Sequence, residues 1–196
     1  IPLVEVATEP LTLTGRGVKR TLDIIASAAA LLCIFWVWLI ICLLVRLDQS
    51  GPILDRLPCL GRGGRIFHLY RFRVTASGKS GEDERLSPVG YILKRLDFER
   101  LSQLLNVLKG DLSLVGPRPM TPDFFEAIIQ EEPLYRRCLT VKPGVTGLAQ
   151  IHGQSHHLTS KLRYDLSYIN NLSILLDLKI LFQSFSVLMT GKKIKA

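Results

Sequence analysis

The stretch NVLKGDLSLVGPRP, residues 106–119, carries the most information about the fold of this chain. It passes from a segment with helical spacing of apolar residues into a turn in which Pro117 and Pro119 flank Arg118. Because proline fixes φ and lowers local chain entropy, this turn holds Arg118 in a defined place. A guanidinium held in this way can bind a phosphate through two parallel hydrogen bonds. The alternative is that Arg118 is a solvated side chain in a surface turn, and the motifs in the rest of the chain decide between the two interpretations.

Composition predicts one domain of modest size with a membrane-facing surface. The 196 residues carry a net charge of +8 together with a mean hydropathy of +0.25, and this combination indicates a basic face toward anionic lipid plus a buried apolar element. Nucleic acid is the alternative partner, but the chain lacks aromatic–basic interleaving, zinc-ligand spacing and a helix-turn-helix pattern. The four cysteines form no Cys-x-x-Cys pair, which favours a reducing compartment and structural roles.

Residues 24–45 form an uncharged apolar run of 22 positions, and roughly 20 apolar residues suffice to span a bilayer. A buried core helix is the alternative. Basic residues flank the run on both sides, including Arg20 and Arg46, and this disfavours sending either end across the membrane. We therefore expect a re-entrant helix with both ends on the cytoplasmic side rather than a spanning one, although the run contains no proline to break it.

The remaining pattern is that of a mainly α domain with one small β-hairpin. Extended stretches around 65–72 predict the hairpin, followed by a mobile loop over 75–85. Apolar residues at helical spacing predict helices over 89–96, 99–109, 123–130, 159–170 and 173–190. A tight loop is expected over 143–147. We expect the helices beside the apolar run to be amphipathic and interfacial.

Several sequence blocks occur in a specific order, and together they carry a family resemblance. They are KRTLD (19–23), SGP (50–52), GRGGRIF (61–67), YRFR (70–73), QLLNVLKGD (103–111), GPRP (116–119) and VKPGVTGLAQ (141–150). This set resembles the bacterial sugar transferase family, the membrane-bound polyprenyl-phosphate phosphoglycosyl transferases. The resemblance runs from about residue 19 to the C-terminus. It divides the chain into a linker or tail of an upstream domain (1–15), a membrane-embedded helical segment (16–47) and a compact cytoplasmic catalytic domain (48–196).

The resemblance implies an enzyme that transfers a sugar 1-phosphate from a UDP-sugar to polyprenyl (undecaprenyl) phosphate. A carboxylate attacks the β-phosphate, UMP leaves, and the lipid phosphate takes over the covalently held sugar phosphate. Mg²⁺ is the implied cofactor, and the bacterial inner membrane, on its cytoplasmic side, is the implied location. The product starts the synthesis of exopolysaccharide, capsule, O-antigen or glycoprotein glycan. The implied partners are the nucleotide sugar, polyprenyl phosphate, membrane lipid and a second copy of the chain in a homodimer, with no nucleic acid.

The family's Asp-Glu catalytic pair falls on Glu99 and Arg100, so the second carboxylate has become a cation. The candidate catalytic residues are Glu99, Arg118 and Asp97, and Glu99 or Asp97 would hold a metal if one is bound. The candidate substrate- and phosphate-binding residues are Arg73, Lys94, Arg95, Arg100, Pro117, Pro119, Lys142, Gly144, Thr146 and Gln150. One hypothesis is that Arg100 partly replaces the metal as a phosphate clamp.

Two other functions remain open at this point. A diverged, catalytically impaired member could act as a binding or assembly partner in a glycan pathway, and the altered pair motivates this reading. A basic membrane adaptor would explain the charge but not the ordered blocks. We expect His152, His156 and His157 to be loop residues rather than metal ligands. Asp165 and Asp177 either orient active-site arginines or pair within the fold.

Overall fold

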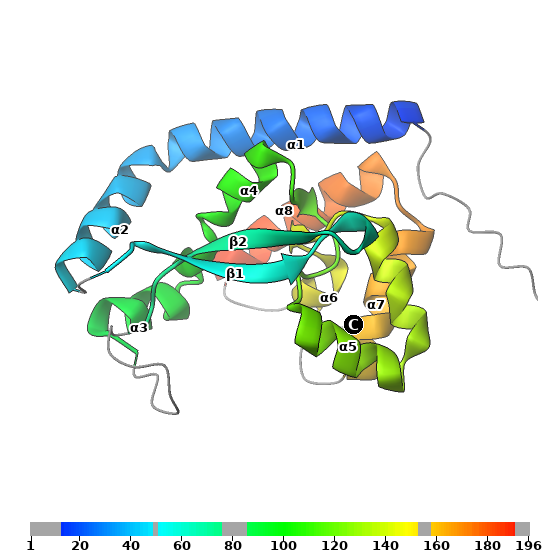
Figure 1. Ribbon diagram of the computed structural model, residues 1–196. Coiled ribbons are helices and arrows are strands. Elements are labelled where there is room, and N and C mark those ends of the chain that lie inside the picture. The colour runs from blue at the N-terminus through cyan, green and yellow to red at the C-terminus, as the bar shows by residue number, and fades with distance from the viewer. Residues whose placement is uncertain (1–12, 49–50, 76–85, 153–157, 191–196) are drawn as a thin grey trace, which may run out of the picture.

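The computed structural model describes residues 13–48, 51–75, 86–152 and 158–190. Figure 1 shows a long bent arm of two helices arching over a domain in which a two-stranded hairpin runs between short helices. The helices are α1 (Leu13–Cys33), α2 (Phe35–Asp48), α3 (Pro88–Arg95), α4 (Gln103–Lys109), α5 (Pro122–Glu131), α6 (Leu148–Ile151), α7 (Leu158–Asn170) and α8 (Ile174–Thr190). The strands are β1 (Leu54–Leu60), β2 (Ile66–Phe72), β3 (Ser113–Val115) and β4 (Gly144–Thr146), and the 3₁₀ turns are η1 (Arg62–Gly64), η2 (Phe98–Arg100) and η3 (Pro133–Thr140). The predicted mainly α fold with a small hairpin is confirmed.

Four predicted helices agree with α3, α5, α7 and α8 to within one residue at each end. The single helix predicted over 99–109 is wrong, because this segment divides into η2 and α4. Asp97 has a left-handed backbone with φ of 57°, and the Ser102 hydroxyl donates to the Tyr70 carbonyl at 3.0 Å. This tie to β2 overrides the helical periodicity of the segment. The loop predicted over 75–85 lies, apart from Thr75, outside the described residues.

The apolar run forms two helical arms that bend by 66° around Ile34. Backbone hydrogen bonds continue through the bend, since Ile34 N donates to Ala30 O at 2.9 Å and Trp38 N donates to Ile34 O at 2.8 Å. Packing explains the bend, because the Trp38 ring lies 5.6 Å from the Phe72 ring of β2. Ile41 is buried in the same cluster. The domain surface therefore sets the direction of α2, and no proline is needed.

Among the described residues, no single helix is both long and apolar enough to cross a membrane, whereas the two arms taken together meet that standard by length and composition.

One turn of α1 ties the arm to three other elements. Lys19 forms an ion pair with Asp177 of α8 and also donates to the Val115 carbonyl of β3 at 3.2 Å. Arg20 donates to the carbonyls of Val107 and Leu108 in α4, at 2.5 and 2.9 Å. A second set of bonds runs to β3, where Asp23 Oδ2 accepts from the Ser113 hydroxyl at 2.8 Å and Oδ1 accepts from Leu114 N at 3.1 Å.

Asn106 of α4 joins the helix to the antiparallel hairpin, whose register pairs Leu54 with Phe72 and Leu60 with Ile66. The Asn106 side chain is fully buried. Its Oδ1 accepts from Tyr70 N at 2.9 Å, and its Nδ2 donates to the His68 carbonyl at 2.8 Å. One amide therefore satisfies two backbone groups of β2, and this fixes the position of α4 and η2 against the hairpin.

A short parallel pair, β3 with β4, carries the proline-flanked turn. Ser113 lies opposite Gly144 and Val115 lies opposite Thr146. Gly144 N donates to the Pro117 carbonyl at 2.8 Å, and a Cβ added to Gly144 would lie 2.1 Å from Gly116 N. Only glycine permits this approach, so the backbone of 143–147 holds the turn that presents Arg118.

Replacing Asn106 with Ala should lower the free energy of unfolding by about 2–4 kcal/mol, because two buried backbone groups lose their partners. For a chain of this size the melting temperature in detergent should then fall by roughly 5–12 °C. Asn171→Ala, at the exposed end of α7, is the matched control and should shift it by less than about 2 °C. Equal shifts for the two variants would contradict this role of Asn106.

Candidate active site

Glu99 occupies the middle of the η2 turn and is one of the few buried acidic side chains of the described residues. It is 7% exposed, and its Oε2 atom has no hydrogen-bond partner among the described residues. The neighbouring carboxylate of Asp97 is exposed and lies 3.6 Å from the Arg100 guanidinium. A buried carboxylate oxygen without a partner is costly in the free protein, so it marks a position prepared for another group.

Arg118 as a whole residue is exposed to solvent. Its charged guanidinium group is partly buried, and this burial lowers the pKa of Arg118. The positive charge of Arg100 lowers this pKa further, whereas the carboxylates of Glu99 and Asp97 raise it, and Arg71 of β2 lowers it. All four groups must therefore lie near the Arg118 guanidinium. The structure thus brings together Glu99, Asp97, Arg100 and Arg118, which the sequence analysis had grouped from separate blocks.

Arg118 also borders a small pocket with mainly apolar walls, including Met120, Phe125 and Leu139. This pocket reaches Tyr135, whose hydroxyl donates to Asp165 Oδ2 at 2.9 Å. Burial is the largest cause that raises the pKa of Asp165, to about 6, while the Tyr135 hydrogen bond and the charge of Lys161 lower it. Arg118 therefore stands between the carboxylate of Glu99 and a buried polar cluster.

Two cations near Arg118, Arg71 and Lys161, were not among the candidates predicted from the sequence. Burial lowers the pKa of Lys161, Asp165 raises it, and Arg118 lowers it, so Lys161 lies near both of these groups. Two sequence signals were available. Arg71 belongs to the YRFR block (70–73), which also holds the predicted Arg73, and Lys161 and Asp165 stand at i,i+4 on α7.

The predicted phosphate-binding residues do not all meet at this site. Arg73 Nε forms an ion pair with Asp55 at 2.9 Å. Lys94 and Arg95 are exposed in the last turn of α3. The Thr146 hydroxyl lies 2.6 Å from the Ser184 hydroxyl, and Gln150 is half-buried in α6. Pro117, Pro119 and Gly144 act through the backbone of the turn.

Lys142 needs a correction, because its side chain lies in a different pocket from Arg118. It shares that pocket with Arg20 and Arg62. These are also the cations that lower its pKa, after burial, while Asp23 raises it. The parallel pairing of β3 and β4 separates the two cations, since the backbone of 142–144 supports the Arg118 turn while the lysine side chain lines the pocket that α1 borders.

Asp165 and Asp177 pair with other side chains of the fold, which is one of the two roles predicted for them from the sequence. Asp165 accepts from Tyr135, and Asp177 accepts from the Tyr168 hydroxyl at 2.8 Å and pairs with Lys19. His152 stacks on Tyr164 with ring centroids 4.7 Å apart, while His156 and His157 lie outside the described residues. Within the described part of the chain, no group of three or more His, Cys, Asp or Glu side chains could hold a metal ion.

Comparison with known proteins gives a consistent picture. The sequence model of the family described as bacterial sugar transferase matches residues 14–191. The "UDP-N-acetylgalactosamine-undecaprenyl-phosphate N-acetylgalactosaminephosphotransferase" of Aeromonas hydrophila is 33% identical over 186 residues, which are 89% of this chain and 44% of that protein. The "Uncharacterized sugar transferase EpsL" of Bacillus subtilis is 37% identical over 170 residues, 83% of each chain. The "UDP-glucose:undecaprenyl-phosphate glucose-1-phosphate transferase" of Caulobacter vibrioides is 34% identical, with 88% of this chain and 70% of that protein covered. The chain thus spans less than half of the Aeromonas protein.

Asp165 should make stability depend on pH in a defined direction. Because its folded pKa of about 6 exceeds its ordinary value of 3.8, the folded state holds this proton more tightly, so the stabilisation is present at low pH and is lost as pH rises through about 6. Asp165→Asn keeps an acceptor for Tyr135 and removes the titration. The melting temperature of the native protein relative to this variant should therefore fall between about pH 4 and pH 6. A constant difference across that range would show that Asp165 does not titrate there.

Proposed function

This chain belongs to the bacterial sugar transferase family, and on that basis we propose that it is a phosphoglycosyl transferase. It transfers a sugar 1-phosphate from a UDP-sugar to polyprenyl phosphate through a covalent intermediate on Glu99. The printed names of the Aeromonas and Caulobacter relatives support this substrate pair. The observation that carries the proposal is the buried, unpartnered Glu99 oxygen beside Arg118.

Glu99 is the nucleophile in this proposal. A carboxylate oxygen attacks the β-phosphorus of the UDP-sugar, a new phosphorus–oxygen bond forms, and the phosphoanhydride bond to UMP breaks. The sugar phosphate is then held on Glu99 as an acyl phosphate. An oxygen of polyprenyl phosphate attacks the same phosphorus, releases the Glu99 carboxylate and yields polyprenyl diphosphosugar. Burial suits this role, because a carboxylate with few water contacts is available for attack.

The surrounding arginines neutralise the charge of the phosphates. The backbone at Arg118 is fixed by two prolines and by the bond from Gly144 N to the Pro117 carbonyl, so little backbone entropy remains to be lost there on binding. Arg100 and Arg71 add positive charge near Arg118. Fixed cations directed at a transferring phosphoryl group stabilise the transition state, since negative charge spreads over its oxygens.

Mg²⁺ was expected from the family resemblance, but the described donor set does not fit a magnesium site. Mg²⁺ is usually held by one or two carboxylates together with substrate phosphates. Here Asp97 pairs with Arg100, and the positive charges of Arg100 and Arg71 beside Arg118 would repel a divalent cation. We therefore assign charge neutralisation to Arg100 and Arg118 and derive no step through a metal.

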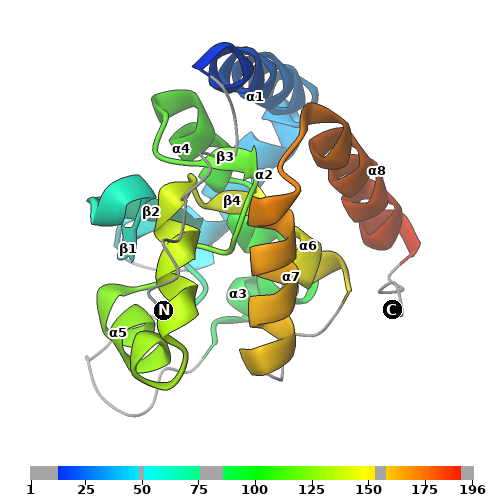
Figure 2. The ribbon, with the colours of Figure 1, turned by 90° about the vertical axis from the view of Figure 1, so that its right-hand side faces the viewer.

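A place at the cytoplasmic face of the bacterial inner membrane also belongs to the proposal. Trp36 of the bent arm is 72% exposed, and α8 exposes Leu175 and Phe182 at 79% and 74%. Figure 2 shows α1 lying across the top of the domain and α8 descending beside it. Exposed apolar surface of this extent marks a membrane or protein contact. Basic residues on both flanks of the arm favour a re-entrant course from the cytoplasmic side.

A catalytically impaired member that only binds nucleotide sugar is the second candidate. Arg100 favours this second candidate, because it places a cation where the family has a carboxylate. Its guanidinium pairs with Asp97 and lies near Arg118. In that case UDP-sugar binds but no UMP is released under any condition.

Glu99→Gln should abolish turnover, because the amide cannot form the acyl phosphate. With detergent-solubilised protein, undecaprenyl phosphate and a panel of UDP-sugars, we expect UMP release to fall by at least about a thousandfold. Glu126→Gln, on the exposed face of α5, is the matched control and should keep full activity. Without the lipid acceptor, the native protein should gain the mass of one sugar phosphate, and the Glu99 variant should not. Retained turnover in Glu99→Gln would refute the assignment.

Arg100→Glu tests whether Arg100 stands in for the metal. Restoring a carboxylate beside Glu99 should raise UMP release or make it depend on Mg²⁺, since the metal then has a second oxygen ligand. The same charge reversal at the exposed Arg136 of η3 controls for net charge. If neither activity nor Mg²⁺ dependence increases in Arg100→Glu, Arg100 does not replace the ion.

A further inference from the structure

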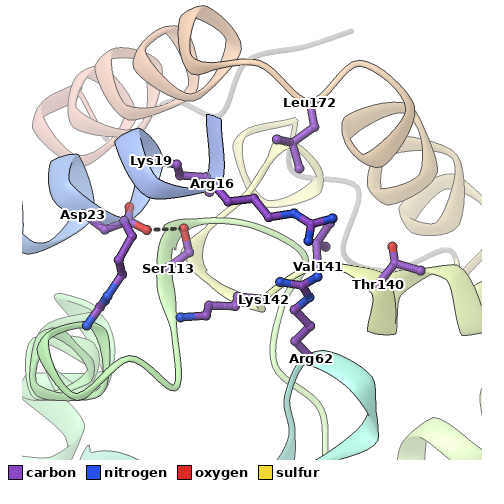
Figure 3. A pocket seen from close by; sticks show the side chains of 10 residues that line it. Arg16, Lys19, Asp23, Arg62, Ser113, Thr140, Val141, Lys142 and Leu172 are labelled. Carbon is purple, nitrogen blue, oxygen red and sulfur yellow. Dashed lines mark hydrogen bonds between the residues drawn. The ribbon is translucent and has the colours of Figure 1, made fainter. Parts of the chain in front are cut away.

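A second pocket lies between α1 and the domain, and the proposed reaction does not use it. Figure 3 shows its walls, with α1 on one side, the η1 turn below and the segment around Val141 opposite. Five of its ten lining residues are cations, whereas Asp23 is the one acidic residue among them. This pocket therefore carries a marked excess of positive charge.

Part of that charge is already committed to the fold. Asp23 accepts from Ser113 and Leu114, so its oxygens serve β3. Lys19 pairs with Asp177, and Arg20 donates to two α4 carbonyls. Within the described ranges, the Arg62 and Lys142 side chains have neither an ion pair nor a hydrogen bond.

Arg62, Lys142 and Arg16 line the same pocket from three separate segments of the chain. In Figure 3 the Arg62 side chain rises from η1 toward Arg16, which reaches across from α1, and Lys142 extends to the left of Arg62. Burial lowers the pKa of Lys142, and the nearby charges of Arg20 and Arg62 lower it further. Holding like charges together costs free energy unless an anion enters. The fold maintains this arrangement, because the cations come from three packed segments: α1, η1 and the residues just before β4.

We propose that this pocket is a second anion site, in which Arg62 and Lys142 bind a phosphate group. The arginine supplies paired donors that match phosphate oxygens, and the lysine supplies a compact charge. Val141 and Leu172 add apolar wall beside the cations, which suits a phosphate that carries an apolar stem. The site is distinct from the one proposed for the reaction, since Lys142 and Arg118 line different pockets.

A phospholipid headgroup and a soluble phosphate share this chemistry. The position of the pocket favours a phospholipid headgroup as the source of the phosphate, because the outer side of the same α1 segment exposes the apolar side chains of Val18, Leu22 and Ile25. If α1 lies at the lipid boundary, as the proposed function requires, the pocket stands at headgroup level. A bound headgroup would then fasten the bent arm to the domain at the membrane surface.

Thermal unfolding in neutral detergent tests the site with two probes at matched ionic strength. One probe is inorganic phosphate, and the other is dihexanoyl phosphatidylglycerol, compared with dihexanoyl phosphatidylcholine. We expect stabilisation by at least one anionic probe. Phosphatidylglycerol alone would identify a lipid site, inorganic phosphate alone a site for soluble ligands, and both a site that recognises the phosphate itself. Stabilisation by neither probe would overturn the proposal.

Matched variants locate the binding. Arg62→Gln and Lys142→Gln should each weaken the apparent affinity by about tenfold or more. Arg65→Gln and Lys179→Gln remove the same charge from exposed positions outside the pocket and should leave the affinity within about twofold. Equal weakening in all four would mean general surface charge and would refute the site. Arg62→Lys keeps a cation and should retain part of the affinity.

The binding measurement does not depend on turnover, so it separates the two proposals. UMP release measured on the same samples reports on Glu99, whereas the thermal shift reports on Arg62 and Lys142. Loss of the shift in Lys142→Gln with circular dichroism unchanged would support the site even if no UDP-sugar is turned over. A native protein that releases UMP but shows no anion-dependent shift would leave the enzyme standing and remove the second site.

Discussion

Three polar side chains on one turn of α1, Lys19, Arg20 and Asp23, hold the helical arm on the domain. They bind β3, α4 and α8 through an ion pair and hydrogen bonds to backbone carbonyls and an amide. An apolar helix gains little by lying along a basic domain, so these polar contacts are what attach α1 there. Because β3 pairs with β4, this attachment also positions the turn that presents Arg118. The arm, the strand pair and the proposed reaction site are thus connected by direct contacts.

Electrostatics divides the domain into two cationic regions. Around Glu99 the arginines face a carboxylate, so attraction within the site offsets part of the cost of gathering positive charge. Around Lys142 the nearby Asp23 is already bonded to β3, and the cations outnumber it. Both regions suit phosphate, but only the first also holds a nucleophile. This difference is why the first is assigned to phosphoryl transfer and the second to binding.

The bent arm shows how packing replaces a local signal. Nothing in the run from 24 to 45 resembles a helix breaker, and the backbone hydrogen bonds around Ile34 remain helical. The bend arises where Trp38 and Ile41 meet β2 and α3, since burying those side chains gains more than a straight helix would. Ser102 acts in the same way when it divides the segment 99–109, because its bond to Tyr70 favours a turn over a continuous helix.

By itself the sequence determined the class of fold, the positions of α3, α5, α7 and α8, and the pairing of Glu99 with Arg118 as a candidate site. Helical periodicity and proline geometry are local properties, so they can be read along the chain. Only the tertiary structure decided that Arg71 and Lys161 stand near Arg118, that Lys142 faces another pocket, and where the arm bends. Those outcomes depend on which side chains meet across distant segments, and the direction in which a side chain leaves a paired strand cannot be known before its partner strand is placed.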